Sequence, residues 1–267
     1  MGKIGVIGCG TMGSAIVKAI APHTKETILL YDINEVAATA LAEATGGRVL
    51  PLKCLLDEAA TIILAVKPQI LPHLYVELYQ ATGKRWISLA AGISLETLVA
   101  NLGSSEVIRI MPNIGAEVAR SVTAITPNEE ASEEFIKETV ALVKLFGSAH
   151  LLSEEHLAAF IGVSASAIST CFEFLHGIAL GGVQQGLPYR EALALISETM
   201  ESATSLIQRG EKHPKELQTG VCSPMGTTIE ALNVVLDNSL AGILMASVEA
   251  ATERALELEF LAKNENN

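Results

Sequence analysis

Hydrophobic residues follow different patterns in the two parts of this 267-residue chain. In the first part, short apolar runs alternate with stretches in which apolar residues recur at helical spacing. Such alternation predicts a doubly wound, mostly parallel sheet with helices on both faces. From Ser153 onward we find no convincing strand, only helical blocks. The sequence therefore predicts an α/β domain over residues 1–152 and an all-helical domain over residues 153–267.

The predicted strands cover Ile4–Ile7, Ile28–Tyr31, Arg48–Leu50, Thr61–Val66, Arg85–Leu89, Val107–Met111, Val122–Thr126 and a segment near His150–Leu152. Helices are predicted between them at Met12–Ile20, Asn34–Thr45, Cys54–Ala60, Leu71–Tyr79, Leu95–Leu102 and Ser132–Phe146. The helical blocks of the second part are Glu155–Val163, Ala167–Gln185, Tyr189–Arg209, Ile229–Leu236 and Leu240–Ala262.

The first strand runs into the glycine-rich turn IGCGTMG. In a dinucleotide-binding turn, Gly8 would permit the tight bend, Gly10 would let backbone N–H groups approach a pyrophosphate, and Gly13 would let helix and strand pack closely. The second strand ends in Asp32, about 20 residues further on, where an acid binds the ribose. The pattern favours a dinucleotide site that includes Thr11 and Met12 of the same turn. The alternative is a structural turn in which Asp32 merely caps the next helix.

Three further stretches follow the carboxyl ends of predicted strands, where ligands bind in sheets of this kind. They are AVKPQ (65–69), SLAAG (88–92) and IMPN (110–113). Lys67 and Asn113 are expected to project polar groups towards the cofactor. Alternatively, each stretch is an ordinary strand end.

The net charge of −12 argues against nucleic acid and anionic lipid as partners, because no basic surplus is present. The apolar run Leu157–Cys171 falls short of the roughly 20 residues that a membrane span needs. Four scattered cysteines indicate reduced, structural thiols in the cytoplasm and no metal site. Cys9 is the exception, since a thiol at a helix N-terminus can have a lowered pKa and become oxidisable.

Several helices of the second part are apolar on more than one face. Such surface is usually covered by another subunit, so we expect a homodimer or a higher homo-oligomer.

The most distinctive block of the second part is GEKHPKELQTGVCSPMGTTIEAL, residues 210–232. Its SPMGTT segment places short hydroxyl side chains immediately before an apolar helix. Exposed helix N–H groups among hydroxyls can bind a small carboxylate. The same residues can instead form an ordinary helix cap, which the residues alone favour.

The motifs IGCGTMG, AVKP, AAG, MPN, GVSAS, GLP and HPKELQTGVCSPMGTT occur in this order along nearly the whole chain. Together they resemble those of Δ1-pyrroline-5-carboxylate reductases. The resemblance implies a Rossmann domain followed by a helical dimerisation domain, with the active site between them and contributed to by both subunits. It also implies hydride transfer from NAD(P)H to a five-membered cyclic imine that carries a carboxylate.

Carried over by residue, the resemblance implies roles for both parts of the chain. It places the pyrophosphate at Gly8, Gly10 and Gly13, and the nicotinamide beside Ala65, Val66, Lys67 and Pro68 and beside Ala90, Ala91 and Gly92. It assigns the substrate carboxylate to Gly226 and Thr227, with Ser223 and Met225 beside them. Thr228 matches the position whose hydroxyl lies near the imine nitrogen and is the expected catalytic residue. His156, His176 and His213 are expected to be structural, with His213 as a helix cap or a packing residue.

Three loops depart from the family pattern. Met225 stands where a glycine is usual, residues 165–169 lack a usual proline and aromatic residue, and Ile114–Gly115 replace a threonine and a proline. The substrate could therefore be a related cyclic imine acid, or the chain a non-catalytic regulatory paralogue. Asp32 favours NADH, because it would repel a 2′-phosphate and no arginine follows before Arg48. NADPH stays possible if Lys25 or Lys53 lies nearby.

Overall fold

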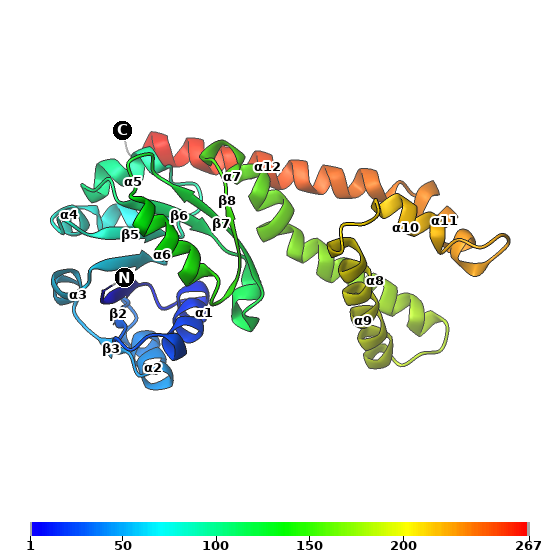
Figure 1. Ribbon diagram of the computed structural model, residues 1–267, viewed down its shortest axis with the longest axis horizontal. Coiled ribbons are helices and arrows are strands. Elements are labelled where there is room, and N and C mark those ends of the chain that lie inside the picture. The colour runs from blue at the N-terminus through cyan, green and yellow to red at the C-terminus, as the bar shows by residue number, and fades with distance from the viewer. Residues whose placement is uncertain (1, 266–267) are drawn as a thin grey trace. The chain divides into compact units, whose positions relative to one another are not determined.

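The computed structural model describes residues 2–265, with side chains up to Lys263. The chain packs as two compact units (Figure 1). One comprises the chain up to Ser166 together with the segment from Ala250 onward, and the other comprises Ala167–Glu249. The last helix thus ends within the first unit. The domain boundary predicted at residue 152 remains a prediction.

The first unit contains an eight-stranded sheet of order β3-β2-β1-β4-β5-β6-β7-β8. Neighbouring strands are parallel except for the antiparallel pair β6–β7, so the predicted doubly wound, mostly parallel sheet is confirmed. The strands are β1 (Ile4–Ile7), β2 (Leu29–Tyr31), β3 (Arg48–Val49), β4 (Thr61–Leu64), β5 (Arg85–Ser88), β6 (Val107–Met111), β7 (Ser121–Pro127) and β8 (Gly147–Leu151).

Helices cover both faces of this sheet, because successive strand residues point to opposite sides. Ile63 of β4 packs in one core and its neighbour Ile62 in the other. The first core is covered by α1 (Thr11–Ile20), α2 (Glu35–Thr45) and α6 (Glu133–Val143). The second is covered by α3 (Leu52–Glu58), α4 (Tyr75–Tyr79) and α5 (Leu95–Leu102). As predicted, Asn34 caps α2, accepting a hydrogen bond from the Ala37 N–H.

One predicted helix is broken in the structure, and another changes helix type along its length. The helix expected over Leu71–Tyr79 is a short 3₁₀ turn, η2 (Leu71–His73), followed by α4. The block expected over Glu155–Val163 consists of η4 (Glu154–His156), α7 (Leu157–Phe160) and the π-helical segment η5 (Ile161–Ser166). The carboxylate of Glu154 pairs with the buried Arg109 of β6 and accepts the Leu95 N–H, which fixes the start of this block on the sheet.

The second unit contains α8 (Ala167–Gln184), α9 (Tyr189–Gln208), α10 (Pro214–Gly220), α11 (Thr227–Asp237) and the beginning of α12 (Leu240–Glu265). Helix α10 is absent from the prediction. Helices α8 and α9 approach closely because Gly182 has no side chain, and a Cβ there would lie 2.9 Å from the Cβ of Ala192.

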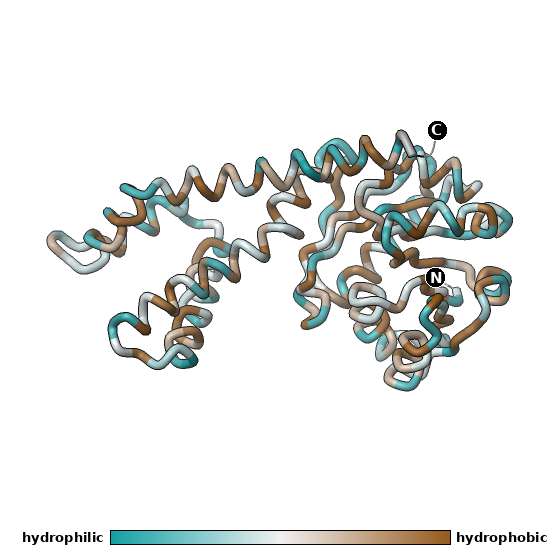
Figure 2. Tube along the Cα trace, turned by 180° about the vertical axis from the view of Figure 1, so that it is seen from behind, coloured by the Kyte–Doolittle hydropathy of each residue, from teal (hydrophilic) through white to brown (hydrophobic). Residues whose placement is uncertain are grey.

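Little of the second unit is buried within this chain. Ala179 is the buried residue of α8 and Ala192 that of α9, whereas large apolar side chains are exposed along the helices. Examples are Phe172, Leu195, Val234, Ile243 and Met245. Figure 2 shows hydrophobic positions, in brown, recurring along these helices.

The apolar run Leu157–Cys171 was predicted to be too short for a membrane span. In the structure it is part of a longer helical stretch. Residues Glu154–Gln184 form 31 consecutive helical residues, long and apolar enough by length and composition to cross a membrane. The bent pair formed by α11 and α12 meets the same test when it is counted as one span. The prediction underestimated this stretch because Glu173 and the serines do not interrupt the helix.

Candidate functional site

The glycine turn has the geometry of a phosphate cradle. Gly8 has φ +104°, and a Cβ there would lie 2.6 Å from the carbonyl oxygen of Ala65, while a Cβ on Gly13 would overlap the carbonyl oxygen of Gly8. Gly10, in contrast, has no atom within 4 Å of its Cβ position. It is the N-cap of α1 and forms no side-chain cap, which leaves the first helix N–H groups open to an anion.

Asp32 braces this turn from the end of β2. One carboxylate oxygen accepts the Cys9 N–H at 2.6 Å, and the other accepts the Asn34 N–H at 2.8 Å. The alternative that Asp32 only caps the next helix is therefore incomplete, because the carboxylate also holds the glycine turn. Asp32 remains partly exposed beside the turn, where a ribose hydroxyl can reach it.

A cavity of about 290 Å³ opens beside Asp32 and the turn. Of the predicted cofactor residues, it brings together Gly8, Gly10, Asp32, Ala65, Val66 and Lys67. Sequence reasoning missed its apolar lining, Ile33, Ile70 and Leu74. Ile33 is 89% exposed and lines the cavity next to Asp32. These residues fit the adenosine half of a dinucleotide.

Cys9 is not the reactive thiol that its place before a helix suggested. Burial, and then the neighbouring Asp32 carboxylate, raise the pKa of the Cys9 thiol to about 12. The thiol points to the carbonyl oxygen of Tyr31 at 3.8 Å. The desolvation of the thiolate therefore raises the pKa of Cys9 by more than the helix N-terminus lowers it.

The other predicted loops lie at the carboxyl ends of β4 and β5. Ala90 is buried and donates its N–H to the Ser88 hydroxyl at 3.3 Å, and Gly92 has φ +76°. Pro68 and Ala91 line a second cavity, of about 250 Å³. The two loops thus meet beside neighbouring strands, as expected for a ligand site on a parallel sheet.

Asn113 is engaged inside the protein rather than projecting freely. Its side-chain oxygen accepts the N–H groups of Gly115 and Val122, and its amide nitrogen donates to Ser164 at 3.4 Å. This network links the MPN loop to the π-helical segment η5. Both polar groups of Asn113 thus have partners within the protein, and its projection towards the cofactor stays a prediction.

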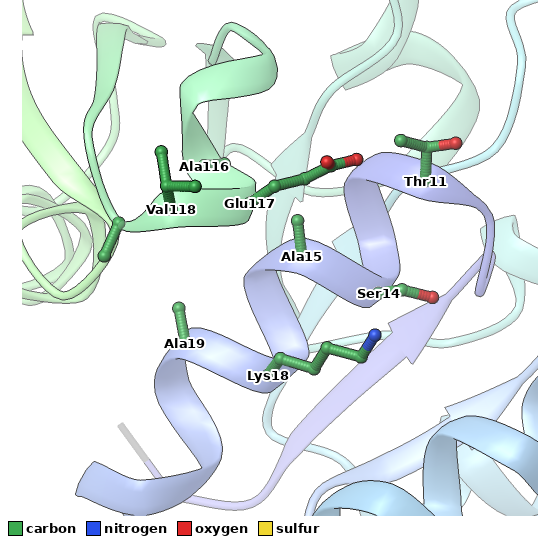
Figure 3. A pocket seen from close by; sticks show the side chains of 9 residues that line it. Thr11, Ser14, Ala15, Lys18, Ala19, Ala116, Glu117 and Val118 are labelled. Atoms are coloured by element: carbon green, nitrogen blue, oxygen red, sulfur yellow. The ribbon is translucent and has the colours of Figure 1, made fainter. Parts of the chain in front are cut away.

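Thr11 borders a separate cavity of about 530 Å³ along the flank of α1 (Figure 3). Its opposite wall is the 3₁₀ turn η3 (Ile114–Val118), from which the Glu117 side chain extends towards Thr11. Met12 lies on the other side of this helix turn, where it packs partly buried against the first core. Of the cofactor residues predicted from the sequence, Thr11 alone lines this cavity.

In the second unit, the SPMGTT segment forms the N-terminus of α11. Gly226 is the N-cap and makes no side-chain cap, so the ordinary cap is not what the structure has. The Gly226 N–H donates to the Ser223 carbonyl at 3.1 Å, and a Cβ on Gly226 would overlap the Ser223 hydroxyl. Thr227 and Thr228, both exposed, are the first residues of the helix. Open N–H groups and hydroxyls therefore gather at one helix end.

Comparisons with known proteins agree with both regions. Residues 154–258 match the family model described as pyrroline-5-carboxylate reductase dimerisation, and residues 3–92 match one described as NADP oxidoreductase, coenzyme F420-dependent. The pyrroline-5-carboxylate reductase of Methanosarcina acetivorans is 33% identical, over 96% of this chain and 97% of that one. The chain belongs to the pyrroline-5-carboxylate reductase family.

Further family members support this. The Escherichia coli pyrroline-5-carboxylate reductase is 33% identical over 98% of this chain and 99% of that one. The crystal structure of 1-pyrroline-5-carboxylate reductase from Streptococcus pyogenes is 29% identical, with a TM-score of 0.87 over 96% of this chain and 98% of that one. The expected family resemblance and the combination of a Rossmann unit with helices are thus confirmed.

Within this family member, His213 has the structural role expected of it. Its ring nitrogen Nδ1 accepts the Lys215 N–H at 3.2 Å, and Glu216 accepts the His213 N–H at 3.0 Å, which forms a capping box at the start of α10. His176 contacts Tyr189 at 2.9 Å, and His156 contacts Ser153 at 2.8 Å. All three histidines form hydrogen bonds with residues near them in the sequence.

Met225 occupies a backbone conformation that favours glycine. Its φ is +55°, and its side chain is 99% exposed in this chain. A side chain in the left-handed region costs about 1–2 kcal/mol. We expect Met225→Gly to raise the free energy of unfolding by about 0.5–1 kcal/mol, since glycine relieves the strain but gains freedom when unfolded. Urea denaturation measures this, with Met225→Ala as the control that keeps the strain; equal stability of both variants would contradict it.

Proposed function

We propose that this chain reduces 1-pyrroline-5-carboxylate to L-proline, with a nicotinamide dinucleotide held at the glycine turn and the substrate at the N-terminus of α11. The observation that carries the proposal is the uncapped start of α11, where Gly226 and Thr227 offer backbone N–H groups to a carboxylate. Ser223 lies directly behind Gly226, and the exposed Met225 borders the same turn.

The chemistry asks little of the protein beyond binding and positioning. A bound NAD(P)H supplies a hydride to the C=N carbon, and one proton on nitrogen completes the amine. The N–H groups at Gly226 and Thr227 orient the substrate through its carboxylate. The Thr228 hydroxyl, next to them on the first turn of α11, donates a hydrogen bond to the imine nitrogen and so helps to deliver the proton that this nitrogen gains.

The direct test is oxidation of NADH or NADPH by the purified protein in the presence of 1-pyrroline-5-carboxylate, followed by nicotinamide absorbance. Turnover that yields proline supports the proposal. Dinucleotide binding without turnover would contradict it. A six-membered cyclic imine carboxylate is the comparison substrate. It is chosen because Met225, with its strained backbone, replaces a usual glycine in the proposed substrate turn. Preference for the six-membered imine would show that this related acid, and not 1-pyrroline-5-carboxylate, is the substrate.

We further propose that NADH is preferred over NADPH, because the Asp32 carboxylate stands beside the predicted ribose position. Asp32→Asn keeps the size of the side chain and removes the charge that repels a 2′-phosphate, at the loss of one of the two backbone N–H bonds that Asp32 accepts. The ratio of kcat/KM for NADH to that for NADPH is expected to fall about tenfold, which corresponds to about 1.4 kcal/mol. Steady-state kinetics with both cofactors measure it. Asp57→Asn, an exposed acid of α3, is the control, and an unchanged ratio in Asp32→Asn would refute the argument.

A homodimer or larger homo-oligomer in the cytoplasm is the proposed state, with no nucleic acid or membrane partner. The exposed apolar helices of the second unit support association, because a helical unit with so little buried surface needs a cover. Four unpaired cysteines suit a reducing compartment. Sedimentation analysis tests the assembly, and a monomer at micromolar concentration would overturn it.

A further inference from the structure

The last turns of α12 return to the first unit and pack against the two loops that follow β4 and β5 (Figure 1). The cavity of about 250 Å³ at this contact is lined by Pro68, Gln69, Pro72, Ala91 and Ile93 on the loop side. On the helix side it is lined by Leu258, Leu261 and Ala262. These three positions share one helix face, because residues three and four apart are neighbours.

The closest approach is at Gly92. This residue has φ +76°, and a Cβ built there would lie 3.4 Å from the backbone carbon and oxygen of Leu258. A side chain at this position would therefore touch the backbone of α12. Ala262 continues the contact, since it packs against the core that contains Ala90 and Ile93.

The loop is anchored at both ends, and of its two middle residues Ala91 is exposed while Gly92 is buried. Ala90 and Ile93 are each 2% exposed, whereas Ala91 is exposed and Gly92 adopts a conformation open to few other residues. α12 covers the middle of the loop, at Ala91 and Gly92. This loop begins at the carboxyl end of β5, where ligands of such sheets bind.

We propose that Leu258 and Leu261 are positioning residues that hold the loops at 65–69 and 90–92 in the shape that receives the nicotinamide half of the dinucleotide. The proposal rests on the dinucleotide site proposed above. The helix acts through the loops and does not touch the cofactor.

The test compares Leu258→Ala/Leu261→Ala with Leu256→Ala/Phe260→Ala, whose side chains are on the same turns but do not line the cavity. NADH binding is followed by nicotinamide fluorescence, and activity by steady-state kinetics. In the first variant we expect Kd and KM for NADH to rise about fivefold while kcat at saturating NADH stays within about twofold of the wild type. The control is expected to bind NADH as the wild type does.

An unchanged Kd in the first variant, or an equal rise in the control, would overturn the proposal. If the double variant does not fold, Leu261→Ala carries the test, because that side chain is already 44% exposed. Wild-type protein that binds NADH but does not reduce the imine refutes the proposed substrate alone. Wild-type protein that binds neither NADH nor NADPH refutes both proposals.

Discussion

Gly13→Ala is expected to destabilise the protein by about 3 kcal/mol, the upper part of the usual range for overpacking. The added methyl group would overlap the carbonyl oxygen of Gly8, which is backbone and cannot rotate away. The helix α1 would have to move off β1, and the Asp32 hydrogen bond to Cys9 between them would be strained. Urea denaturation measures the loss, and dinucleotide binding should fall with it.

Gly10→Ala is the matched control, because its methyl group meets no atom within 4 Å. Its stability should stay within about 1 kcal/mol of the wild type, the usual cost of changing an N-cap glycine. NADH affinity should nevertheless fall at least tenfold, since the methyl group stands where the pyrophosphate approaches the backbone. Wild-type stability of Gly13→Ala, or wild-type affinity of Gly10→Ala, would show that the turn is not the cradle described.

Thr228→Ala should lower kcat about 100-fold with 1-pyrroline-5-carboxylate, the lower end of what a positioned proton donor contributes. The threonine lies exposed on the first turn of α11, and alanine is a good helix residue, so the fold should tolerate the change. NADH binding should be unaffected, because the glycine turn lies in the other compact unit. Stopped-flow absorbance at saturating substrate measures the loss.

Thr228→Ser is the control that keeps the hydroxyl, and it should retain most of the activity. Equal losses in the alanine and serine variants would indicate that the methyl group or the packing of the helix matters. Full activity of Thr228→Ala would remove the hydroxyl from the mechanism and leave positioning by the helix N–H groups as the contribution of α11.

The parallel sheet was predictable because each strand is a short apolar run that lies between segments whose apolar residues recur at helical spacing. The strand β6 was predicted over its full length, and α5 likewise, since Ser94 and Gly103 mark the two ends of that helix. The antiparallel direction of β7 was not specified, because an apolar run reads the same in either direction. The short helix α10 was missed since it is exposed and has no apolar period.

The geometry of the glycine turn, the proposed cofactor site, was predictable where the backbone needs a particular residue type. Gly8, Gly13 and Asp32 are such residues. The partners of Asn113 were not predictable, because they lie on β7 and η5, which only the fold brings to the MPN loop. Desolvation of Cys9 was missed for the same reason, since burial is a property of the assembled core.

The order of segments along the chain also has a consequence for synthesis. The sheet-bearing unit is made from two separated pieces, and its second piece begins at Ala250. At about 5–20 residues per second, a ribosome needs roughly 4–17 s to pass from Ser166 to Ala250. The sheet-bearing unit therefore emerges with its β5 loop unsupported, and α12 can close against it only after the helices of the second unit have been made.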